Sequence, residues 1–456
     1  MTDSPYWNPK VETLPRADLR RLQLAKLRTC LSWAAERSPY YRQSLAAAGV
    51  APDNPGAELR SWTDIRRLPF LTREHWMTAQ AEHPPYGTLP VAGDDAAIRL
   101  HTTSGTSGKE PLRALDSRKD WAWTAEMWCY GMWAQGIRPA DVAYVAFGYG
   151  SFIGFWGLHY GLEKLGALVI PGGAQPTERR VRQIVDFGAT VVASTPTYAL
   201  RLAQEAESQG LDLRSSPVHT LVLSGEPAGS IPATKRLIEQ HWGAKAYDTA
   251  GMTEISTIFM FECAHQPGGA HIIEDHLIEE VIDPLTDEPV DYGEKGERVV
   301  TSFGRSMIPL IRYRTNDLVV KIPGERCACG RSFDIYEGGV LGRSDDMKVV
   351  RGTNVYARAI ESLVRGHEEI DEFQIKITRD GARDEIALRI ELLDQQHAAE
   401  TARAWPRLAE KLHKELADAH EGLNFHVQLA DPGSLPRFEL KARRLVDERP
   451  KATGRA

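Results

Sequence analysis

The middle of the chain, from about residue 120 to residue 250, alternates short apolar runs with longer amphipathic stretches. The apolar runs are rich in β-branched residues and cover residues 142–146, 168–170, 190–193 and 220–223. The stretches between them have a helical spacing of apolar positions, over residues 121–135, 155–165, 178–187, 198–209 and 232–241. Because strands that alternate with helices form parallel sheets covered on both faces, this pattern predicts a doubly wound α/β sheet.

The regions before and after this segment have different patterns of apolar and polar residues. Residues 11–37 repeat apolar positions at three and four, which predicts a helix, and residues 39–100 are rich in proline and short loops. After about residue 280 the pattern becomes strand and turn. Residues 373–377 and 386–392 flank Asp380-Gly381 as a hairpin would, and a helix (397–419) and a strand (425–429) follow. We therefore predict a large N-terminal domain, residues 1–342, and a small mobile C-terminal α+β domain, residues 343–456.

Composition narrows the class of protein. A chain of 456 residues exceeds one ordinary domain, and 42% hydrophobic with 26% charged residues is typical of a globular protein with a full core. The net charge of -7 argues against a nucleic-acid protein, whose affinity comes mainly from basic surface. No apolar run is long enough to span a bilayer, and the first residues do not have the pattern of a signal peptide. We expect a cytoplasmic protein that binds neither nucleic acid nor membrane.

A loop of small and hydroxyl-bearing residues precedes the alternating region. It comprises Ser104, Gly105, Thr106, Ser107, Gly108 and Lys109. The glycines let backbone N–H groups turn inward, and the hydroxyls and the lysine add donors, so such a loop can wrap a polyphosphate. Its spacing is not that of a P-loop, and an ordinary mobile loop is the alternative.

Other polar motifs follow apolar runs, at the place where ligands collect in α/β sheets. Residues 224–227 could present backbone groups to a flat heterocycle. Thr253 could bond a phosphate, and the adjacent Glu254 could hold Mg²⁺, which prefers carboxylate and phosphate oxygens. Asp317 is suited to accept hydrogen bonds from a ribose diol. Taken singly, residues of these types are more often ordinary surface or turn residues.

The combination of these motifs, in this order, resembles the phenylacetate–CoA ligase family of the adenylate-forming superfamily. That superfamily includes acyl-CoA synthetases, nonribosomal peptide synthetase adenylation domains and luciferases. The resemblance covers nearly the whole chain, from Tyr6-Trp-Asn-Pro and Leu68-Pro-Phe-Leu-Thr-Arg-Glu to Pro309-Leu-Ile-Arg-Tyr-Arg-Thr and Gly342-Arg-Ser-Asp-Asp-Met.

The resemblance implies an AMP-forming acid–thiol ligase. In such enzymes a carboxylate attacks the α-phosphorus of MgATP to give an acyl-adenylate, and the thiol of coenzyme A then displaces AMP. An aromatic carboxylic acid is the expected substrate. The alternatives are delivery of the aryl group to a carrier-protein thiol or an amine, and a degenerate member that only binds nucleotide. A homodimer is common among similar proteins.

The resemblance also implies roles for individual residues. The loop 104–109 would hold the β- and γ-phosphates, Thr253, Glu254 and Lys441 would be catalytic, and Asp345 would be the hinge of the small domain. The remaining nucleotide-binding set is Ser224, Gly225, Glu226, Pro227, Asp248, Asp317 and Arg343. Two positions depart from the family pattern, because Leu440 replaces the usual glycine before Lys441 and Glu110 follows the phosphate loop.

The acid pocket is expected from two segments. By their match to the family, the candidate substrate-binding residues are Tyr149, Phe152, Ile153, Ala250, Gly251 and Met252. An aromatic wall suits a flat aryl acid of about benzoate size. The alternative is that residues 152–156 are simply the buried start of a helix.

Three of the five cysteines could bind metal. Cys327-Ala-Cys329 is a tight chelating pair, and Cys263 lies near His265 and His271. Three thiolates and one histidine suit a tetrahedral structural Zn²⁺, and some family members are similar in carrying such a metal. We favour Cys263, His271, Cys327 and Cys329 as ligands, with His265 as the rival histidine and free thiols as the alternative.

Overall fold

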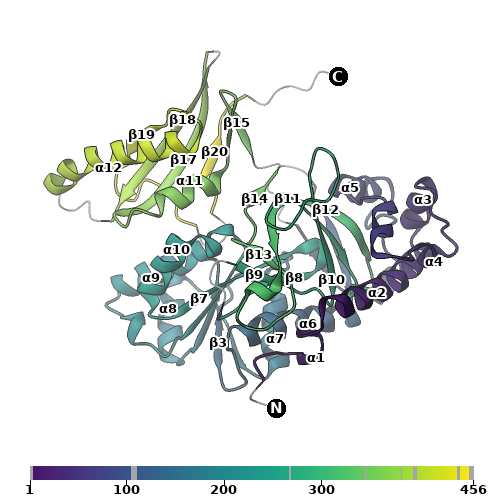
Figure 1. Ribbon diagram of the computed structural model, residues 1–456. Coiled ribbons are helices and arrows are strands. Elements are labelled where there is room, and N and C mark those ends of the chain that lie inside the picture. The colour runs from purple at the N-terminus through teal and green to yellow at the C-terminus, as the bar shows by residue number, and fades with distance from the viewer. Residues whose placement is uncertain are drawn as a thin grey trace.

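The computed structural model describes residues 4–103, 110–265, 269–344, 347–381, 383–393, 398–438 and 442–450. Figure 1 shows a large body that contains the long sheet and a smaller one built from the C-terminal elements. The predicted mixed α/β class, with a small C-terminal α+β domain, is confirmed.

In the described part of the chain, twelve strands form the main sheet. One half is parallel, in the order β4-β3-β5-β6-β7, and the other half continues antiparallel through β8, β9, β13, β12, β11 and β10, with β14 on β12. The parallel strands are β3 (Val142–Val145), β4 (Leu168–Pro171), β5 (Val191–Ser194), β6 (Thr220–Ser224) and β7 (Lys245–Met252). The others are β8 (Thr257–Glu262), β9 (Gly269–Ile272), β10 (Leu277–Ile282), β11 (Lys295–Ser302), β12 (Leu310–Ile322), β13 (Ile335–Glu337) and β14 (Gly342–Arg343).

Helices cover both faces of the parallel half, as the alternating pattern predicted. Successive strand residues point to opposite faces. On β3, Ala143 and Val145 belong to the core beneath α6 and α7, whereas Tyr144 belongs to the core beneath α8, α9 and α10. These helices are α6 (Arg118–Ala134), α7 (Trp156–Leu165), α8 (Thr177–Asp186), α9 (Pro196–Ser208) and α10 (Pro232–Trp242).

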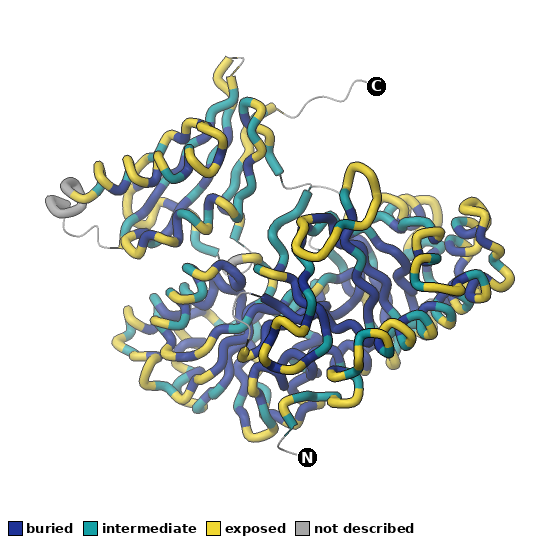
Figure 2. Tube along the Cα trace, in the orientation of Figure 1, coloured by how far each residue is buried: buried dark blue, intermediate teal, exposed yellow. Residues whose placement is uncertain are grey.

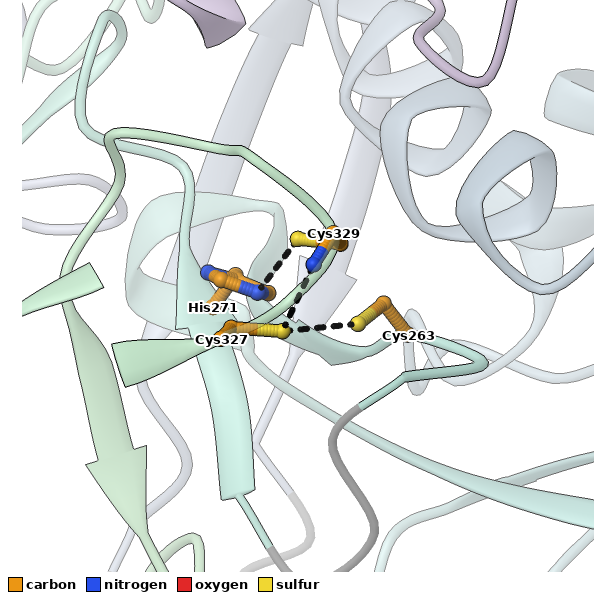
Figure 3. Close-up of side chains that lie close together, drawn as sticks. All are labelled: Cys263, His271, Cys327 and Cys329. Carbon is orange, nitrogen blue, oxygen red and sulfur yellow. Dashed lines mark hydrogen bonds between the residues drawn. The ribbon is translucent and has the colours of Figure 1, made fainter. Parts of the chain in front are cut away.

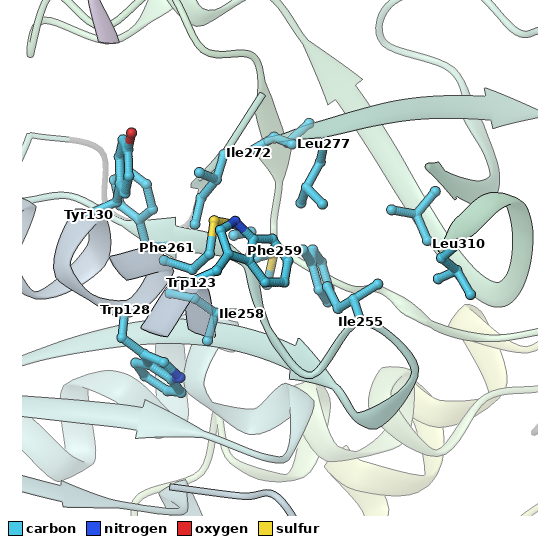
Figure 4. Close-up of a cluster of buried hydrophobic side chains, with 14 of the residues drawn as sticks. Trp123, Trp128, Tyr130, Ile255, Ile258, Phe259, Phe261, Ile272, Leu277 and Leu310 are labelled. Atoms are coloured by element: carbon cyan, nitrogen blue, oxygen red, sulfur yellow. The ribbon is translucent and has the colours of Figure 1, made fainter. Parts of the chain in front are cut away.

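The core of the large domain is apolar and aromatic. Figure 4 shows side chains of α6, such as Trp123 and Trp128, beside those of β8, such as Ile258 and Phe261. Gly131 in α6 allows this approach, because a Cβ there would lie 3.0 Å from the Cβ of Phe261. Most strands of the main sheet are accordingly dark blue in Figure 2, whereas the edge strand β4 is partly exposed.

The N-terminal region packs along the antiparallel half of the sheet (Figure 1). The single helix predicted over residues 11–37 is wrong in one respect, since it is split into α1 (Pro9–Glu12) and α2 (Arg16–Arg37). Pro15 lacks an N–H and disfavours a helical conformation of the residue before it, which explains the break. The other elements here are α3 (Pro39–Ala47), α4 (Pro55–Glu58), α5 (Arg73–Glu82), β1 (Ala97–Thr102) and β2 (Arg113–Ser117).

The C-terminal elements form a sheet of their own, in the order β19-β18-β17-β20. The predicted hairpin is present as β17 (Ile370–Asp380) and β18 (Arg383–Leu392), and its core side chains include Phe373 and Leu388. The remaining elements are β15 (Lys348–Val350), β16 (Thr353–Val355), α11 (Ala357–Val364), α12 (Ala398–Ala419), β19 (His426–Leu429) and β20 (Leu445–Asp447). Among the described residues, no helix combines the length and apolar character needed to cross a membrane.

Candidate active site

The carboxyl ends of β3, β5, β6 and β7 lie at one edge of the sheet, because these strands are parallel neighbours. Ser224 is the last residue of β6, and the chain then turns at Gly225, whose φ is +97°. Glycine adopts this conformation without strain, whereas a side chain would be strained there. Pro227 begins a short 3-10 helix, Pro227–Ser230. The predicted adenine-binding residues therefore form a tight turn at this edge.

Glu226 is tied to the first turn of α9. Its Oε2 accepts a 2.7 Å hydrogen bond from the hydroxyl of Thr197, and burial raises the pKa of the Glu226 carboxyl. The same hydroxyl accepts a 3.3 Å bond from Arg444 of the small domain. Arg444 in turn contacts Glu372 at 2.7 Å and Glu361 at 3.1 Å. The small domain thus contacts the turn at the predicted adenine site through Thr197, and Arg358 of α11 also donates a 3.1 Å hydrogen bond to the hydroxyl of Ser230 in that turn.

Asp248 lies on β7 beneath this turn. Burial, together with the neighbouring Glu262 carboxylate, raises its pKa to about 7. The turn closes tightly over it, because a Cβ at Gly229 would lie 2.6 Å from Asp248 Oδ1. Asp248 is therefore a buried acid that supports the turn.

Thr253 and Glu254 form the short 3-10 helix Thr253–Ile255 that follows β7. Glu254 Oε1 lies 3.3 Å from the hydroxyl of Tyr313 and 3.4 Å from Arg73, and Arg305 donates to the backbone oxygen of Glu254. The Glu254 carboxylate is therefore largely buried and held by one arginine and one tyrosine hydroxyl.

Arg73 is a residue of the site that the sequence analysis did not single out. Besides Glu254, it donates a 3.2 Å hydrogen bond to the hydroxyl of Thr103, the residue before the predicted phosphate loop. Its position in the motif Leu68-Pro-Phe-Leu-Thr-Arg-Glu was the available signal. Only the fold brings this N-terminal motif to the end of β7.

Asp317 and Arg343 face each other across the β12–β14 pair. The Arg343 guanidinium lies 3.7 Å from Asp317 Oδ1, and Arg298 lies 3.4 Å from Oδ2 on the other side. Burial raises the pKa of Asp317, and the two arginines oppose this rise. The nearby Glu254 carboxylate adds to it, so the predicted ribose and magnesium residues lie in one electrostatic site.

The predicted acid-pocket residues lie on two segments at the same edge. Tyr149, Phe152 and Ile153 are in the loop after β3, because α7 begins only at Trp156. The Tyr149 ring lies 4.6 Å from the Trp156 ring, and its hydroxyl lies 2.9 Å from His159 Nδ1. Ala250, Gly251 and Met252 are the last residues of β7. The predicted phosphate loop 104–109, the hinge Asp345, Leu440 and the catalytic Lys441 lie outside the described residues.

A second cluster lies at the antiparallel half of the sheet. The ligand atoms of Cys263, His271, Cys327 and Cys329, all buried, lie within 4.8 Å of one another, and Figure 3 shows the four side chains converging. Cys263 Sγ is 3.6 Å from Cys327 Sγ, and Cys329 Sγ is 3.3 Å from His271 Nε2. The rival, His265, is exposed and not part of this cluster.

The surroundings of the cluster orient its histidine. His271 Nδ1 lies 2.9 Å from the carbonyl oxygen of Phe333, so it donates there and Nε2 faces the thiols with its lone pair. The hydroxyl of Tyr6 donates a 2.8 Å bond to the carbonyl of Cys329 and helps to close the site. Three sulfurs and one nitrogen suit tetrahedral Zn²⁺.

Comparison with known proteins identifies the family. Residues 23–306 match the model of the AMP-binding enzymes, and residues 352–449 match that of the AMP-binding enzyme C-terminal domain. The chain is 35% identical to a phenylacetate–coenzyme A ligase of Thermus thermophilus, over 97% of this chain and 99% of the relative. It is 34% identical to the Pseudomonas putida ligase of the same name, over 96% of each.

The chain belongs to the phenylacetate–CoA ligase family. This confirms the predicted adenylate-forming superfamily and the predicted enzyme class, an AMP-forming acid–CoA ligase.

The chain is also similar to a solved relative in two states. The chain is 32% identical to a 2-hydroxyisobutyryl-CoA ligase and covers 98% of its own length and 93% of that chain. The TM-score is 0.92 to this ligase in the postadenylation state with its acyl-AMP. It is 0.73 to the same ligase in the thioesterification state, with 98% and 94% covered. Since both structures are of one ligase, the chain as a whole is more similar to the postadenylation structure of that ligase than to its thioesterification structure.

Proposed function

We propose that the protein uses ATP to activate a small aromatic carboxylic acid and then transfers the acyl group to coenzyme A. The observation that carries this proposal is the convergence of two segments at one sheet edge. The loop after β3 carries Tyr149, which packs against Trp156 at the start of α7, and the 3-10 helix after β7 carries Glu254. Aromatic side chains suit the ring of an aryl acid, and the Glu254 carboxylate nearby suits the Mg²⁺ of the ATP with which that acid would react.

The donor chemistry at this edge fits a magnesium nucleotide. Asp317 and Arg343 would hold the ribose, Glu226 and its neighbours would border adenine, and the loop 104–109 would hold the β- and γ-phosphates. The hydroxyl of Thr253 and the carboxylate of Glu254 are hard oxygen donors of the kind that Mg²⁺ and phosphate prefer. Bound Mg²⁺ would stabilise negative charge on the phosphate oxygens. Lys441 would approach the reacting carboxylate, and Asp345 would be the hinge between domains 1–342 and 343–456.

The identity of the acid is inferred from the lining of the pocket. Tyr149, Phe152, Ile153 and the end of β7 are candidates for contact with the acid. The named relatives act on phenylacetate, which supports an acid with one aromatic ring. The 2-hydroxyisobutyryl-CoA ligase has the same fold but a small aliphatic acid. The side chains of the loop after β3, rather than the fold, would therefore determine which acid is bound. The comparisons give no support to a carrier protein, an amine acceptor or a homodimer.

We further propose that Cys263, His271, Cys327 and Cys329 bind a structural Zn²⁺. The support is the soft, closed ligand set and the orientation of His271 by Phe333. Four protein ligands leave no open position for a substrate, so this metal would stabilise the fold rather than take part in the reaction.

The test of the ligase proposal is pyrophosphate release measured with MgATP over a panel of benzoates, phenylacetates and short aliphatic acids. We expect release with a one-ring acid and, when coenzyme A is added, an acyl-CoA detected by mass spectrometry. Lys441→Ala should abolish release, whereas replacement of the exposed Lys245 serves as the matched control. Preference for an aliphatic acid would contradict the substrate assignment. Adenylation without an acyl-CoA product would contradict the acceptor.

A further inference from the structure

Arg298, on β11, is fully buried behind the proposed ribose site. Two of its nitrogens donate to Glu279 on β10, at 2.8 and 2.6 Å. Its third nitrogen lies 3.4 Å from Asp317 Oδ2 and 3.4 Å from the sulfur of Met252. The guanidinium also lies over the Phe259 ring at 3.5 Å. One buried side chain therefore contacts both the proposed ribose residue and the proposed acid-pocket segment.

The pair with Glu279 already neutralises Arg298. Glu279 is fixed in turn by the hydroxyl of Tyr336 at 3.0 Å. A buried ion pair is weak evidence for stability, because desolvation offsets much of the attraction between the charges. The contact of the third nitrogen with Asp317 is not needed for this pairing. This contact instead fixes one oxygen of the Asp317 carboxylate, Oδ2, from the buried side.

We propose that Arg298 is a positioning residue for the nucleotide, which orients the Asp317 carboxylate toward the ribose diol. The inference rests on the proposed role of Asp317. Arg343 contacts the other oxygen, Oδ1, but it is half-exposed and lies on the short strand β14, next to the proposed hinge. Arg298 lies on β11, which is held between β10 and β12 in the main sheet of the large domain. It therefore keeps the carboxylate oriented when the small domain moves.

The charge around Asp317 gives a second consequence. Arg298 on β11 and Arg343 on β14 favour the ionised carboxylate, whereas burial and Glu254 after β7 disfavour it. Removal of Arg298 therefore raises the pKa of Asp317. A protonated carboxyl accepts ribose hydrogen bonds less well than a carboxylate does. As the pH is lowered, the variant without Arg298 should therefore begin to lose nucleotide affinity at a higher pH than the wild-type enzyme does.

The experiment compares the affinities for AMP and 2′,3′-dideoxy-AMP by titration calorimetry, in the full-length protein. The wild type should prefer AMP, and Asp317→Asn should lose that preference. Arg298→Met should lower the AMP preference about tenfold, the value of a hydrogen bond to a charged group. Its affinity for dideoxy-AMP should stay within about twofold of wild type, because that ligand makes no such bond. The double variant should lose no more than Asp317→Asn alone.

Arg312→Met is the matched control. Arg312 is also a buried arginine on an inner strand, β12, and it is paired with Glu280 at 3.0 Å. Its guanidinium donates to Glu280 and to the backbone oxygens of Arg66 and Leu68, rather than to Asp317. We expect it to lower stability without changing the AMP preference. If Arg298→Met does not fold, Arg298→Lys keeps the charge but not the fork, and its AMP preference is measured over pH 5–8.

The outcomes separate the two proposals. Equal losses for AMP and dideoxy-AMP would make Arg298 a purely structural residue and overturn the inference. An unchanged AMP preference in Arg298→Met would do the same, while the role of Asp317 would stand. A wild type without any preference for AMP would overturn the ribose role of Asp317 and this inference with it.

Discussion

The proposed nucleotide edge and the Cys/His cluster both belong to the large domain, but their polar side chains have different kinds of partner. At the nucleotide edge, Glu254 and Asp317 are each paired with an arginine that is itself partly exposed, Arg73 or Arg343. At the cluster, all four ligand side chains are buried, and their outer contacts go to backbone carbonyls and neighbouring side chains.

This difference fits the two kinds of cation site proposed above. A carboxylate that is paired with a partly exposed arginine can exchange this partner for a ligand, because the arginine can turn into solvent without disturbing the core. Buried thiols cannot exchange their partners for a substrate in this way, so a metal bound to them would contribute only to the stability of the fold. The two sites should therefore respond oppositely to mutation, one in rate and the other in stability.

The largest effect should follow Glu254→Gln. The amide keeps the size of the side chain but removes the charge that would hold Mg²⁺. We expect pyrophosphate release to fall by at least about 100-fold, as when one preorganised charge-stabilising group is removed. The melting temperature should change little. The exposed Glu325 is the control, because Glu325→Gln should retain full activity. A variant of Glu254 that retains its rate would remove the distinction between the two sites.

Cys327→Ser should show the reverse. We expect zinc content, measured by elemental analysis, to fall from about one ion per chain, and the melting temperature to drop by more than about 5 °C. The rate of the folded enzyme at 20 °C should stay near wild type. Cys30→Ser, a change outside the cluster, should alter neither quantity. A metal-free wild type that is fully stable would eliminate the proposed zinc.

Arg444→Met tests the contact between the small domain and the adenine turn. The substitution removes the donors to Thr197 and to two glutamates, so the arrangement in which the small domain contacts this turn should lose population. We expect an adenylation rate lower by roughly five- to tenfold, the effect of one charged hydrogen bond, and a larger radius of gyration by X-ray scattering. The neighbouring Arg443 is exposed, and Arg443→Met should change neither. An unchanged scattering curve for Arg444→Met would exclude its role in docking.

The smallest effect should be the pH dependence at Asp248. Because its pKa is raised to about 7 in the folded protein, from an ordinary 3.8, the folded state holds the proton more tightly than the unfolded chain does. Its contribution to stability is full below about pH 4 and is lost as the pH rises through 7. Asp248→Asn removes that loss, so its melting temperature should exceed wild type by roughly 2–4 °C at pH 8 and less at pH 5. The exposed Asp53→Asn should show no such trend.

Local pattern sufficed for much of the fold. The predicted strands over 142–146 and 220–223 correspond to β3 and β6, because buried strands read as short β-branched runs between helices. The hairpin at Asp380-Gly381 was predicted for the same kind of reason. The break of the first helix at Pro15 was missed, since apolar spacing continues across it.

The residues of the candidate site likewise fall into two groups, those that the sequence indicated and those that only the structure revealed. Motifs indicated Glu254 and Asp317, because their residue types suit Mg²⁺ and ribose. Arg298 was missed, since an arginine in a chain rich in charge has no local signature. Arg73 was missed although it lies in the motif Leu68-Pro-Phe-Leu-Thr-Arg-Glu, because only the fold brings that motif to Glu254. The sequence favoured His271 over His265 as a metal ligand but left His265 as a rival. The structure supports His271, because it is buried beside the three thiols whereas His265 is exposed.

The sequence alone determined the family, the alternating α/β order and the chemical types of the candidate residues, because these depend on local spacing and side-chain chemistry. Only the tertiary structure decided which of them meet. The parallel strands place their carboxyl ends at one edge, and β12 and β14 bring Asp317 opposite Arg343. Arg298 comes behind them from β11. Such contacts join residues far apart in the chain, and the pairing of strands, rather than any local preference, sets their distances.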